Sequence, residues 1–227
     1  MNSFMCPPHV VIFDFNGTLF DDIHVAYGSV QEIFRTYNIP CPTLEQYRGE
    51  ISANYMEFYY NHGFPRTTTG DELNVIKNGF YKTTGRGAQI RHDVWKTLSG
   101  LSALGIFTAI VSAETEINLY RYLIQSDNLQ KSFDFIKAEA WGVQGKEKAL
   151  LRVAEIFGKE PRQIVYVDDS VDGLTSAKNV GVIPVAFTNS TGYNSEHRLM
   201  QVTEFSIQEI GELNNFLKKF SSCDSYF

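Results

Sequence analysis

The chain has few cysteines, a deficit of positive charge and no long apolar run near its start. Its 227 residues include three cysteines, Cys6, Cys41 and Cys223, and we expect free thiols in a reducing compartment. With a formal net charge of −6, the chain has no excess of positive charge of the kind that binds nucleic acid. The apolar run Val10–Phe13 is too short for a signal or membrane segment. We therefore expect a cytoplasmic protein without nucleic-acid or membrane partners.

The composition, 43% hydrophobic and 20% charged, is that of an ordinary globular protein. The chain also contains five short apolar runs bounded by turns. Helix-period segments lie between the later runs, one at 115–125 and one at 146–157. Strands that alternate with helices predict an α/β fold with a doubly wound parallel sheet. The predicted strands are Val10–Phe15, Ile106–Val111, Phe133–Ile136, Ile164–Val167 and Ile183–Phe187. The predicted inner helix faces are Ile117, Tyr120, Leu123 and Ile124, then Leu150, Val153, Ala154 and Phe157.

Residues 22–88 interrupt this alternation, because they are rich in aromatic residues and offer no convincing strand. Capping boxes at Thr43–Gln46 and Thr69–Glu72 predict helix starts. We therefore expect a small helical cap domain at 22–88 and an α/β core domain at 1–21 and 89–227. The aromatic residues favour the core of a helix bundle over substrate contacts. A final amphipathic helix, capped by Ser206–Glu209, is expected to run to about Phe220.

Two strand ends carry polar groups that suggest chemistry. The first strand delivers the Asp14 carboxylate, and Asn16–Thr18 then turns the chain sharply. A later strand ends at Ser112. In an open α/β sheet, ligands bind beyond the carboxyl ends of the strands. Taken alone, Asp14 is equally consistent with a solvated corner, and Ser112 is more consistent with a helix cap.

Two further segments add charge at the same edge. The helix macrodipole disfavours a lysine at a helix start, so Lys146 suggests an anionic ligand, whereas Lys148 suits a solvated face. The adjacent carboxylates Asp168 and Asp169 repel each other unless a cation is present or one is protonated. Mg²⁺ is the natural partner for such oxygen ligands. One carboxylate could cap the helix predicted at 172–180, but that explanation does not account for both.

Taken in order, Asp14–Thr18, Ser112, Lys146 and Asp168–Asp169 resemble the four motifs of the haloacid dehalogenase (HAD) superfamily. The aromatic insert resembles the C1-type helical cap of its phosphoglycolate phosphatase-like branch. The resemblance implies a phosphatase that acts on a small phosphorylated substrate through an aspartyl-phosphate.

The resemblance also implies roles for particular residues. Asp14 would be the nucleophile, and Ser112 and Lys146 would bind the transferred oxygens. Mg²⁺ would lie between Asp14, the Asn16 carbonyl and Asp169, while Asp168 would orient metal-bound waters or pair with Lys146. Asp172 is a less favoured member of this shell. Thr18, Ala113 and Arg48 complete the expected substrate-binding residues. Arg48 and Arg66 are the basic residues that could meet an anionic leaving group, but the sequence favours ordinary surface charges at both positions.

Asn16 departs from the family pattern, in which a second aspartate at this position serves as general acid and base. Losing such catalysis costs about 10²–10⁴ in rate. Three outcomes remain open: preference for an activated phosphate, a surrogate acid at Asp21 or in the cap, or an impaired phosphate-binding protein. An Asn16→Asp variant is expected to recover alkyl phosphates in the first case.

Other classes fit less well. A 2-haloacid dehalogenase would tolerate Asn16 but has no evident use for Asp168 and Asp169. A signalling receiver domain would be about half this length, without the insert. The sequence leaves the substrate and the oligomeric state open, and a monomer is compatible with it.

Overall fold

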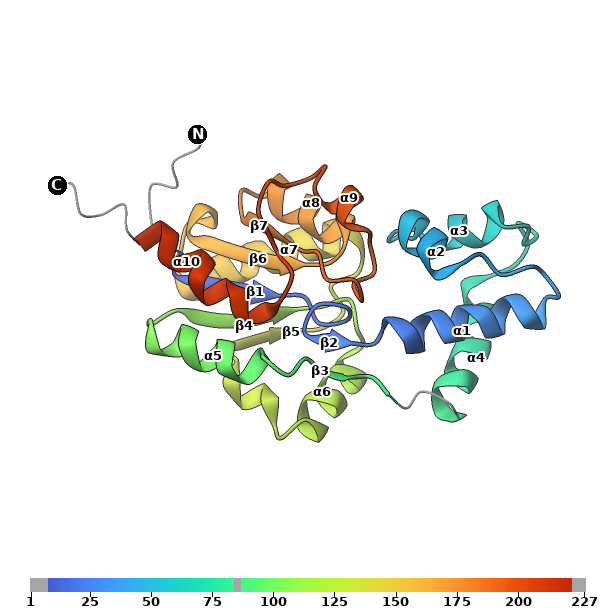
Figure 1. Ribbon diagram of the computed structural model, residues 1–227, viewed down its shortest axis with the longest axis horizontal. Helices are drawn as coiled ribbons and strands as arrows, with labels where there is room; N and C mark the ends of the chain where they lie inside the picture. The colour runs from blue at the N-terminus through green and yellow to red at the C-terminus, as the bar shows by residue number, and fades with distance from the viewer. Residues whose placement is uncertain (1–7, 84–86, 222–227) are drawn as a thin grey trace.

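The protein is built around a parallel sheet with helices on both faces and a group of helices at one end (Figure 1). The structure is a computed structural model that describes residues 8–83 and 87–221. Six strands lie in the order β5-β4-β1-β6-β7-β8. They are β1 (Val10–Phe13), β4 (Phe107–Val111), β5 (Phe135–Lys137), β6 (Ile164–Asp168), β7 (Ile183–Phe187) and β8 (Ser206–Ile207). The predicted doubly wound α/β fold is confirmed.

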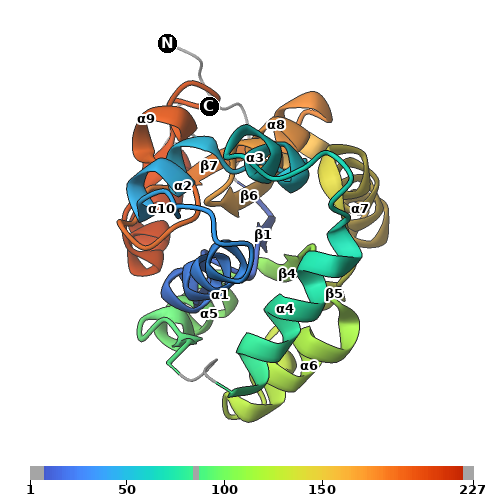
Figure 2. The same ribbon diagram turned by 90° about the vertical axis from the view of Figure 1, so that its right-hand side faces the viewer.

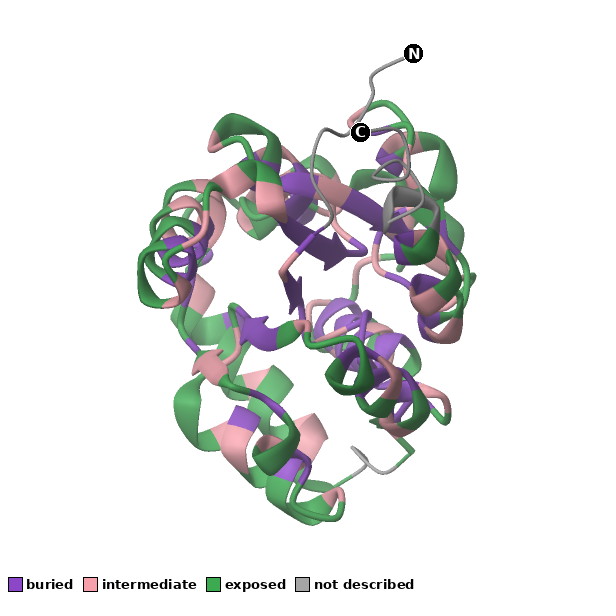
Figure 3. Cartoon of the chain, turned by 90° about the vertical axis from the view of Figure 1, so that its left-hand side faces the viewer, coloured by how far each residue is buried: buried purple, intermediate pink, exposed green. Residues whose placement is uncertain are grey.

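The alternating side chains of β1 enter two separate cores, one on each face of the sheet. Val10 and Ile12 pack with residues of α7 and α8, whereas Val11 and Phe13 pack with residues of α5, α6 and α10. A strand buried on both faces is apolar throughout, as β1 is, and Figure 3 shows the sheet as the buried centre of the core. These helices are α5 (Val94–Ala103), α6 (Glu116–Gln125), α7 (Gly142–Phe157), α8 (Val171–Asn179) and α10 (Leu213–Ser221).

The position of β1 decides where polar groups meet. It pairs in parallel with β4 on one side and β6 on the other, with Phe13 opposite both Ile110 and Val167. The residues that follow these three strands therefore lie side by side at the carboxyl edge of the sheet. This edge carries the first, second and fourth motifs identified in the sequence.

Four helices project beyond this carboxyl edge, and we call them the helical segment (Figures 1 and 2). They are α1 (Ile23–Thr36), α2 (Leu44–Glu50), α3 (Tyr55–Asn61) and α4 (Gly70–Thr83). The chain enters through β2 (Phe20–Asp21) and returns through β3 (Gln89–Ile90), which pair antiparallel. The two connections to the core thus lie next to each other, and neither short strand was predicted.

Aromatic side chains form the interior of the helical segment, as predicted. Phe34 is fully buried, and its ring lies 6.0, 5.7 and 4.9 Å from the rings of Phe58, Tyr59 and Phe64, respectively. The two predicted capping boxes are also present. Thr43 exchanges hydrogen bonds with Gln46, and Thr69 does the same with Glu72. Local helix signals were therefore recognisable in this segment.

The predicted inner face of α6 is partly wrong. Thr115 caps this helix, and its buried residues are Leu119 and Leu123. Ile117 and Ile124 were expected inside but are 82% and 52% exposed. Residues four apart lie on one helical face, so α6 offers two apolar stripes, and the sheet covers the one that contains Leu119 and Leu123.

The predicted C-terminal helix starts too early. Ser206 and Ile207 form β8, which pairs with Ala186 and Phe187, so an added strand replaces the expected capping box. The helix α10 begins at Leu213, after the 3₁₀ helix Ile210–Glu212. The remaining short helices are α9 (Glu196–Leu199) and two 3₁₀ helices, Leu129–Ser132 and Pro161–Gln163. Within the described residues, every helix falls short of the length and apolar character that crossing a membrane requires.

Phe34→Ala should lower the free energy of unfolding by about 3–5 kcal/mol, because it leaves a cavity among three aromatic rings. Urea denaturation of both proteins measures the difference. Ile117→Ala is the control, since 82% exposure of this side chain predicts a change within about 0.5 kcal/mol. Equal effects of the two substitutions would contradict the assigned core.

Candidate active site

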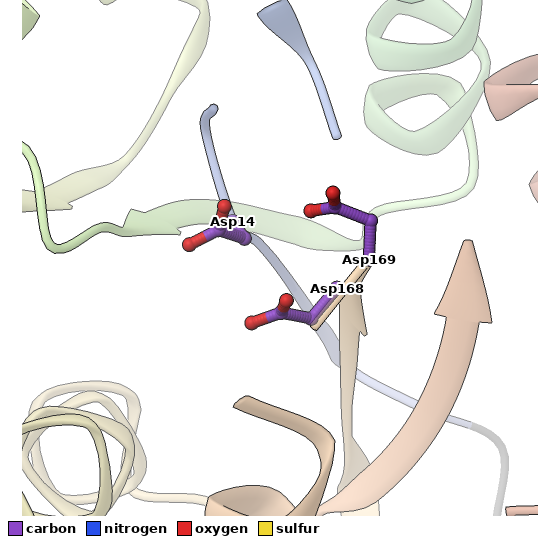
Figure 4. A group of neighbouring side chains, drawn as sticks. All are labelled: Asp14, Asp168 and Asp169. Carbon is purple, nitrogen blue, oxygen red and sulfur yellow. The ribbon is translucent and has the colours of Figure 1, made fainter. Parts of the chain in front are cut away.

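Three carboxylates and one ammonium group meet at the carboxyl edge of the sheet. Lys146 Nζ donates to Asp14 Oδ1 at 2.8 Å and to Asp168 Oδ2 at 2.6 Å. Asp14, Asp168 and Asp169 each offer an oxygen within 4.8 Å of the others (Figure 4). All four residues are buried, with at most 7% exposure. Lys146 therefore joins the residue after β1 to the last residue of β6.

Lys146 reaches this cluster from the second turn of α7, because the helix begins at Gly142 rather than at the predicted residue 146. Burial alone would lower its pKa, but Asp14 and Asp168 outweigh burial and raise it, so the side chain stays charged. Lys148 is exposed. Of the two lysines left open by the sequence, Lys146 is the one in the cluster.

The donor set suits a hard cation. Burial, followed by the charge of Asp168, raises the pKa of Asp169 to about 7. Three carboxylates face one ammonium group, so the cluster has excess negative charge, and its available ligand atoms are carboxylate oxygens. Oxygen ligands are those that Mg²⁺ and Ca²⁺ take. The cluster could therefore bind a metal ion.

The two adjacent carboxylates have different partners. Asp168 Oδ1 accepts hydrogen bonds from Ser170 N and Oγ, both at 2.7 Å, while its other oxygen binds Lys146. Asp169 Oδ1 accepts from Thr18 Oγ1 at 2.8 Å, and Oδ2 accepts from Tyr193 N at 2.5 Å. Asp168 thus pairs with Lys146, one of its two expected roles. Thr18, expected to bind substrate, instead holds Asp169 and does not line the adjoining cavity.

A cavity of about 690 Å³ opens above the cluster. Its floor includes Asp14 and Lys146, and α4 contributes Lys77 and Tyr81 from the opposite side. A volume of this size accommodates a small metabolite, and both the core and the helical segment contribute to its walls. A ligand that fills the cavity would therefore contact both Asp14 and α4.

Ser112 and Ala113, both expected to bind substrate, line this cavity. Ser112 follows β4 and is 1% exposed, and its Oγ accepts a hydrogen bond from Glu114 N at 3.0 Å. It does not cap α6, since Thr115 does. The alternative interpretation of Ser112 as a helix cap is therefore wrong.

The basic residues expected to meet a leaving group lie elsewhere. Arg48 donates from Nε to the Gly192 carbonyl at 2.7 Å and from Nη2 to the Asn189 carbonyl at 3.2 Å. It connects α2 to the loop 189–194 and does not line the cavity. Arg66 is an exposed surface residue that pairs with Glu57 at 3.1 Å. Each guanidinium finds its partners in the protein, which the sequence could not reveal.

A second contact also joins the helical segment to the core. Asp172, at the start of α8, lines the cavity and accepts a hydrogen bond from Ala53 N at 2.6 Å. The Asp172 carboxylate is thus engaged by the backbone of residue 53 and is not a member of the carboxylate cluster.

Asp22 is the site residue that the sequence analysis missed. Its carboxylate is 4% exposed, lines the cavity and accepts hydrogen bonds from Asn16, Gly17 and Tyr193. Burial raises its pKa to about 6. Asp21, named as a surrogate acid, does not line the cavity and lies 3.5 Å from Arg91. Asp21 pairs with Gln89 of β3, whereas Asp22 follows the strand at the N-cap of α1 and turns toward the cavity.

Comparisons with known proteins agree with this geometry. The family model for haloacid dehalogenase-like hydrolases matches residues 11–187, a stretch that includes every member of the cluster. The chain belongs to this family. It is therefore a HAD-family hydrolase, and its cavity and carboxylate cluster lie within the matched region. The search of curated proteins found no match.

Solved structures share the fold over almost the whole chain. A HAD-like protein of unknown function from Agrobacterium tumefaciens is 20% identical, with a TM-score of 0.75 and coverage of 94% of this chain and 99% of the other. A predicted phosphatase from Clostridium acetobutylicum is 16% identical, with a TM-score of 0.74 and coverage of 94% and 100%. A predicted phosphoglycolate phosphatase from Haemophilus somnus is 18% identical, with a TM-score of 0.72 and coverage of 93% and 99%.

Lys146→Met should lower the free energy of unfolding by about 3–5 kcal/mol at neutral pH, because it leaves buried carboxylates without their cation. Chemical denaturation measures the loss. Lys148→Met, on the exposed side of the same helix, should change stability by less than about 0.5 kcal/mol. A Lys146→Met protein as stable as the control would show that the ion pairs contribute little to stability.

Proposed function

We propose that the protein is a Mg²⁺-dependent phosphatase that acts on a small phosphorylated metabolite, with Asp14 as the phosphoryl acceptor. The observation that supports this most directly is the Lys146 bridge between Asp14 and Asp168 on the floor of the cavity. One ammonium group there both orients the carboxylate nucleophile and offers positive charge to a phosphate dianion.

Each protein group has a defined part in this proposal. Asp14 Oδ1 accepts a hydrogen bond from Lys146, which leaves Oδ2 to attack phosphorus. The attack forms an Asp14–phosphorus bond and breaks the bond to the leaving oxygen, and water then hydrolyses the aspartyl-phosphate. Ser112 and Lys146 bind the transferred oxygens, and the exposed Ala113 lies beside them at the cavity wall.

We assign the metal site to Asp14, the backbone carbonyl of Asn16 and Asp169. Bound Mg²⁺ would neutralise the negative charge that otherwise repels a phosphate from the carboxylate nucleophile. Thr18 and Tyr193 hold Asp169 in place for this role through hydrogen bonds of 2.8 and 2.5 Å. Asp168 stays paired with Lys146.

The helical segment supports a preference for leaving groups that depart as anions. In-line attack places the leaving group opposite Asp14, on the side of the cavity that α4 lines. Lys77 lies there, with its ammonium 5.8 Å from the Tyr81 ring, and no carboxylate of the described residues lies within 4.0 Å of it. Since an amide at position 16 gives no proton, an acyl phosphate or a phosphoric anhydride suits this site.

We further propose that residues 22–88 act as a cap domain over a core of residues 1–21 and 89–227. Closure of such a cap excludes water and completes the site. We place the protein in the cytoplasm because Cys41 is an exposed free thiol, whereas Cys6 and Cys223 lie outside the described residues.

Phosphate release at neutral pH should depend on Mg²⁺ and vanish in Asp14→Asn. The assay compares an alkyl phosphate, an aryl phosphate, an acyl phosphate and pyrophosphate, with and without EDTA. Removal of the nucleophile predicts a loss of at least about 10³-fold. Release that persists in Asp14→Asn would contradict the proposal, and release from none of the substrates would favour an impaired phosphate-binding protein.

Lys77→Met should lower kcat/KM for pyrophosphate by about tenfold or more, because it removes the cation beside a leaving phosphate that is charged both before and after cleavage. Phenyl phosphate, whose leaving group is neutral in the substrate and gains a single charge on cleavage, should lose less than about threefold. Lys82→Met is the control, since Lys82 is exposed on the same helix and does not line the cavity. Equal losses on all substrates would refute a role in leaving-group binding.

A further inference from the structure

Asp22 lies at the centre of a set of three hydrogen-bond donors. Its Oδ2 accepts from Asn16 Nδ2 at 2.8 Å and from the Tyr193 hydroxyl at 3.1 Å, and its Oδ1 accepts from Gly17 N at 3.0 Å. A carboxylate with 4% exposure requires such partners, because burial without them is costly. The side chain is therefore fixed in one orientation.

This orientation costs Asp22 a local interaction. Asp22 occupies the N-cap position of α1, where aspartate is among the preferred residues, yet its side chain makes no cap hydrogen bond. It turns toward Asn16 and Gly17 instead. Its placement thus serves the turn that follows Asp14 rather than the helix that it precedes.

We propose that Asn16 and Asp22 form a matched pair in which Asp22 is a positioning residue for the Asn16 amide. The inference rests on the proposed function, because it assigns the pair to the same site. Since Asn16 donates from Nδ2 to Asp22, its carbonyl oxygen Oδ1 is the acceptor left for a ligand in the cavity. That oxygen can accept a hydrogen bond from water or a leaving group and thereby orient it.

The pair explains why position 16 holds an amide in this chain. An ionised carboxylate at residue 16 would face the Asp22 carboxylate across the present 2.8 Å contact with no hydrogen to donate, and the two charges would repel unless one group took up a proton. Asn16 is therefore matched to Asp22, so the recovery of alkyl phosphates expected of Asn16→Asp requires the exchange at position 22 as well.

The geometry predicts that the two groups can be exchanged. In the double variant Asn16→Asp/Asp22→Asn, the oxygen of the amide introduced at position 22 accepts from Gly17 N. The nitrogen of the same amide donates to the carboxylate introduced at position 16 and to the Tyr193 oxygen. Every contact of the original pair then has a donor and an acceptor. In Asp22→Asn alone, the Asn16 amide must reverse, so that its Nδ2 faces the cavity.

The experiment compares wild type, both single variants, the exchanged double variant and Asp21→Asn. We expect each single variant to lose about tenfold or more in kcat on an aryl phosphate, with KM within about threefold. The double variant should recover most of this loss and exceed the product of the single effects by at least about tenfold. Asp21→Asn, the matched control beside Asp22, should stay within about threefold of wild type.

Thermal unfolding of the same proteins gives a readout that does not depend on turnover. Asn16→Asp should lower the Tm by roughly 4 °C or more, and the exchange should restore it. A double variant whose activity is no better than the product of the single effects, or whose Tm is no better than the sum of the single shifts predicts, would overturn the matched pair. Failure of the proposed function is separate, because it appears as phosphate release by the wild type that does not require Asp14.

Discussion

The ion pairs of Lys146 with Asp14 and Asp168 are the interaction on which the rest of the site depends. Buried charges are stable only when paired, and one ammonium group here partners carboxylates from adjacent strands. The parallel pairing of β1 and β6 brings these carboxylates together, and α7 supplies the cation. The pairing of β1 with β6 and the placement of α7 after β5 are therefore both required to form this cluster of charges.

The loop 189–194 extends this cluster toward the helical segment. Tyr193 donates from its backbone to Asp169 and from its hydroxyl to Asp22, which spans the distance from the carboxylate cluster to the start of α1. The neighbouring carbonyls of Asn189 and Gly192 bind Arg48 on α2. The helical segment is thus attached to the core through the same loop that holds Asp169. A shift of the helical segment over the cavity would therefore also displace this loop and its hydrogen bond to Asp169.

Strand ends were the predictable part of this protein. A buried strand needs an apolar run, so β1 and β6 were visible, and so were the Asp14 and Asp168–Asp169 carboxylates that follow them. Side-chain partners were not predictable, because they depend on tertiary contacts. Arg48 looked available for a substrate but binds backbone carbonyls, and Ile117 looked buried but faces solvent. Asp22 was missed because its position before a helix predicts an N-cap, whereas its side chain instead accepts hydrogen bonds from Asn16, Gly17 and Tyr193.

The central claim is that Asp14 accepts a phosphoryl group, and the most direct measurement is mass spectrometry of the acid-quenched protein. The protein is mixed with acetyl phosphate and Mg²⁺, quenched within its turnover time and digested. The account predicts a peptide heavier by one phosphoryl group, with the modification on Asp14 and with no such peptide when Mg²⁺ is chelated. A phosphoryl group on any other residue, or phosphate release with Asp14 never modified, would contradict it.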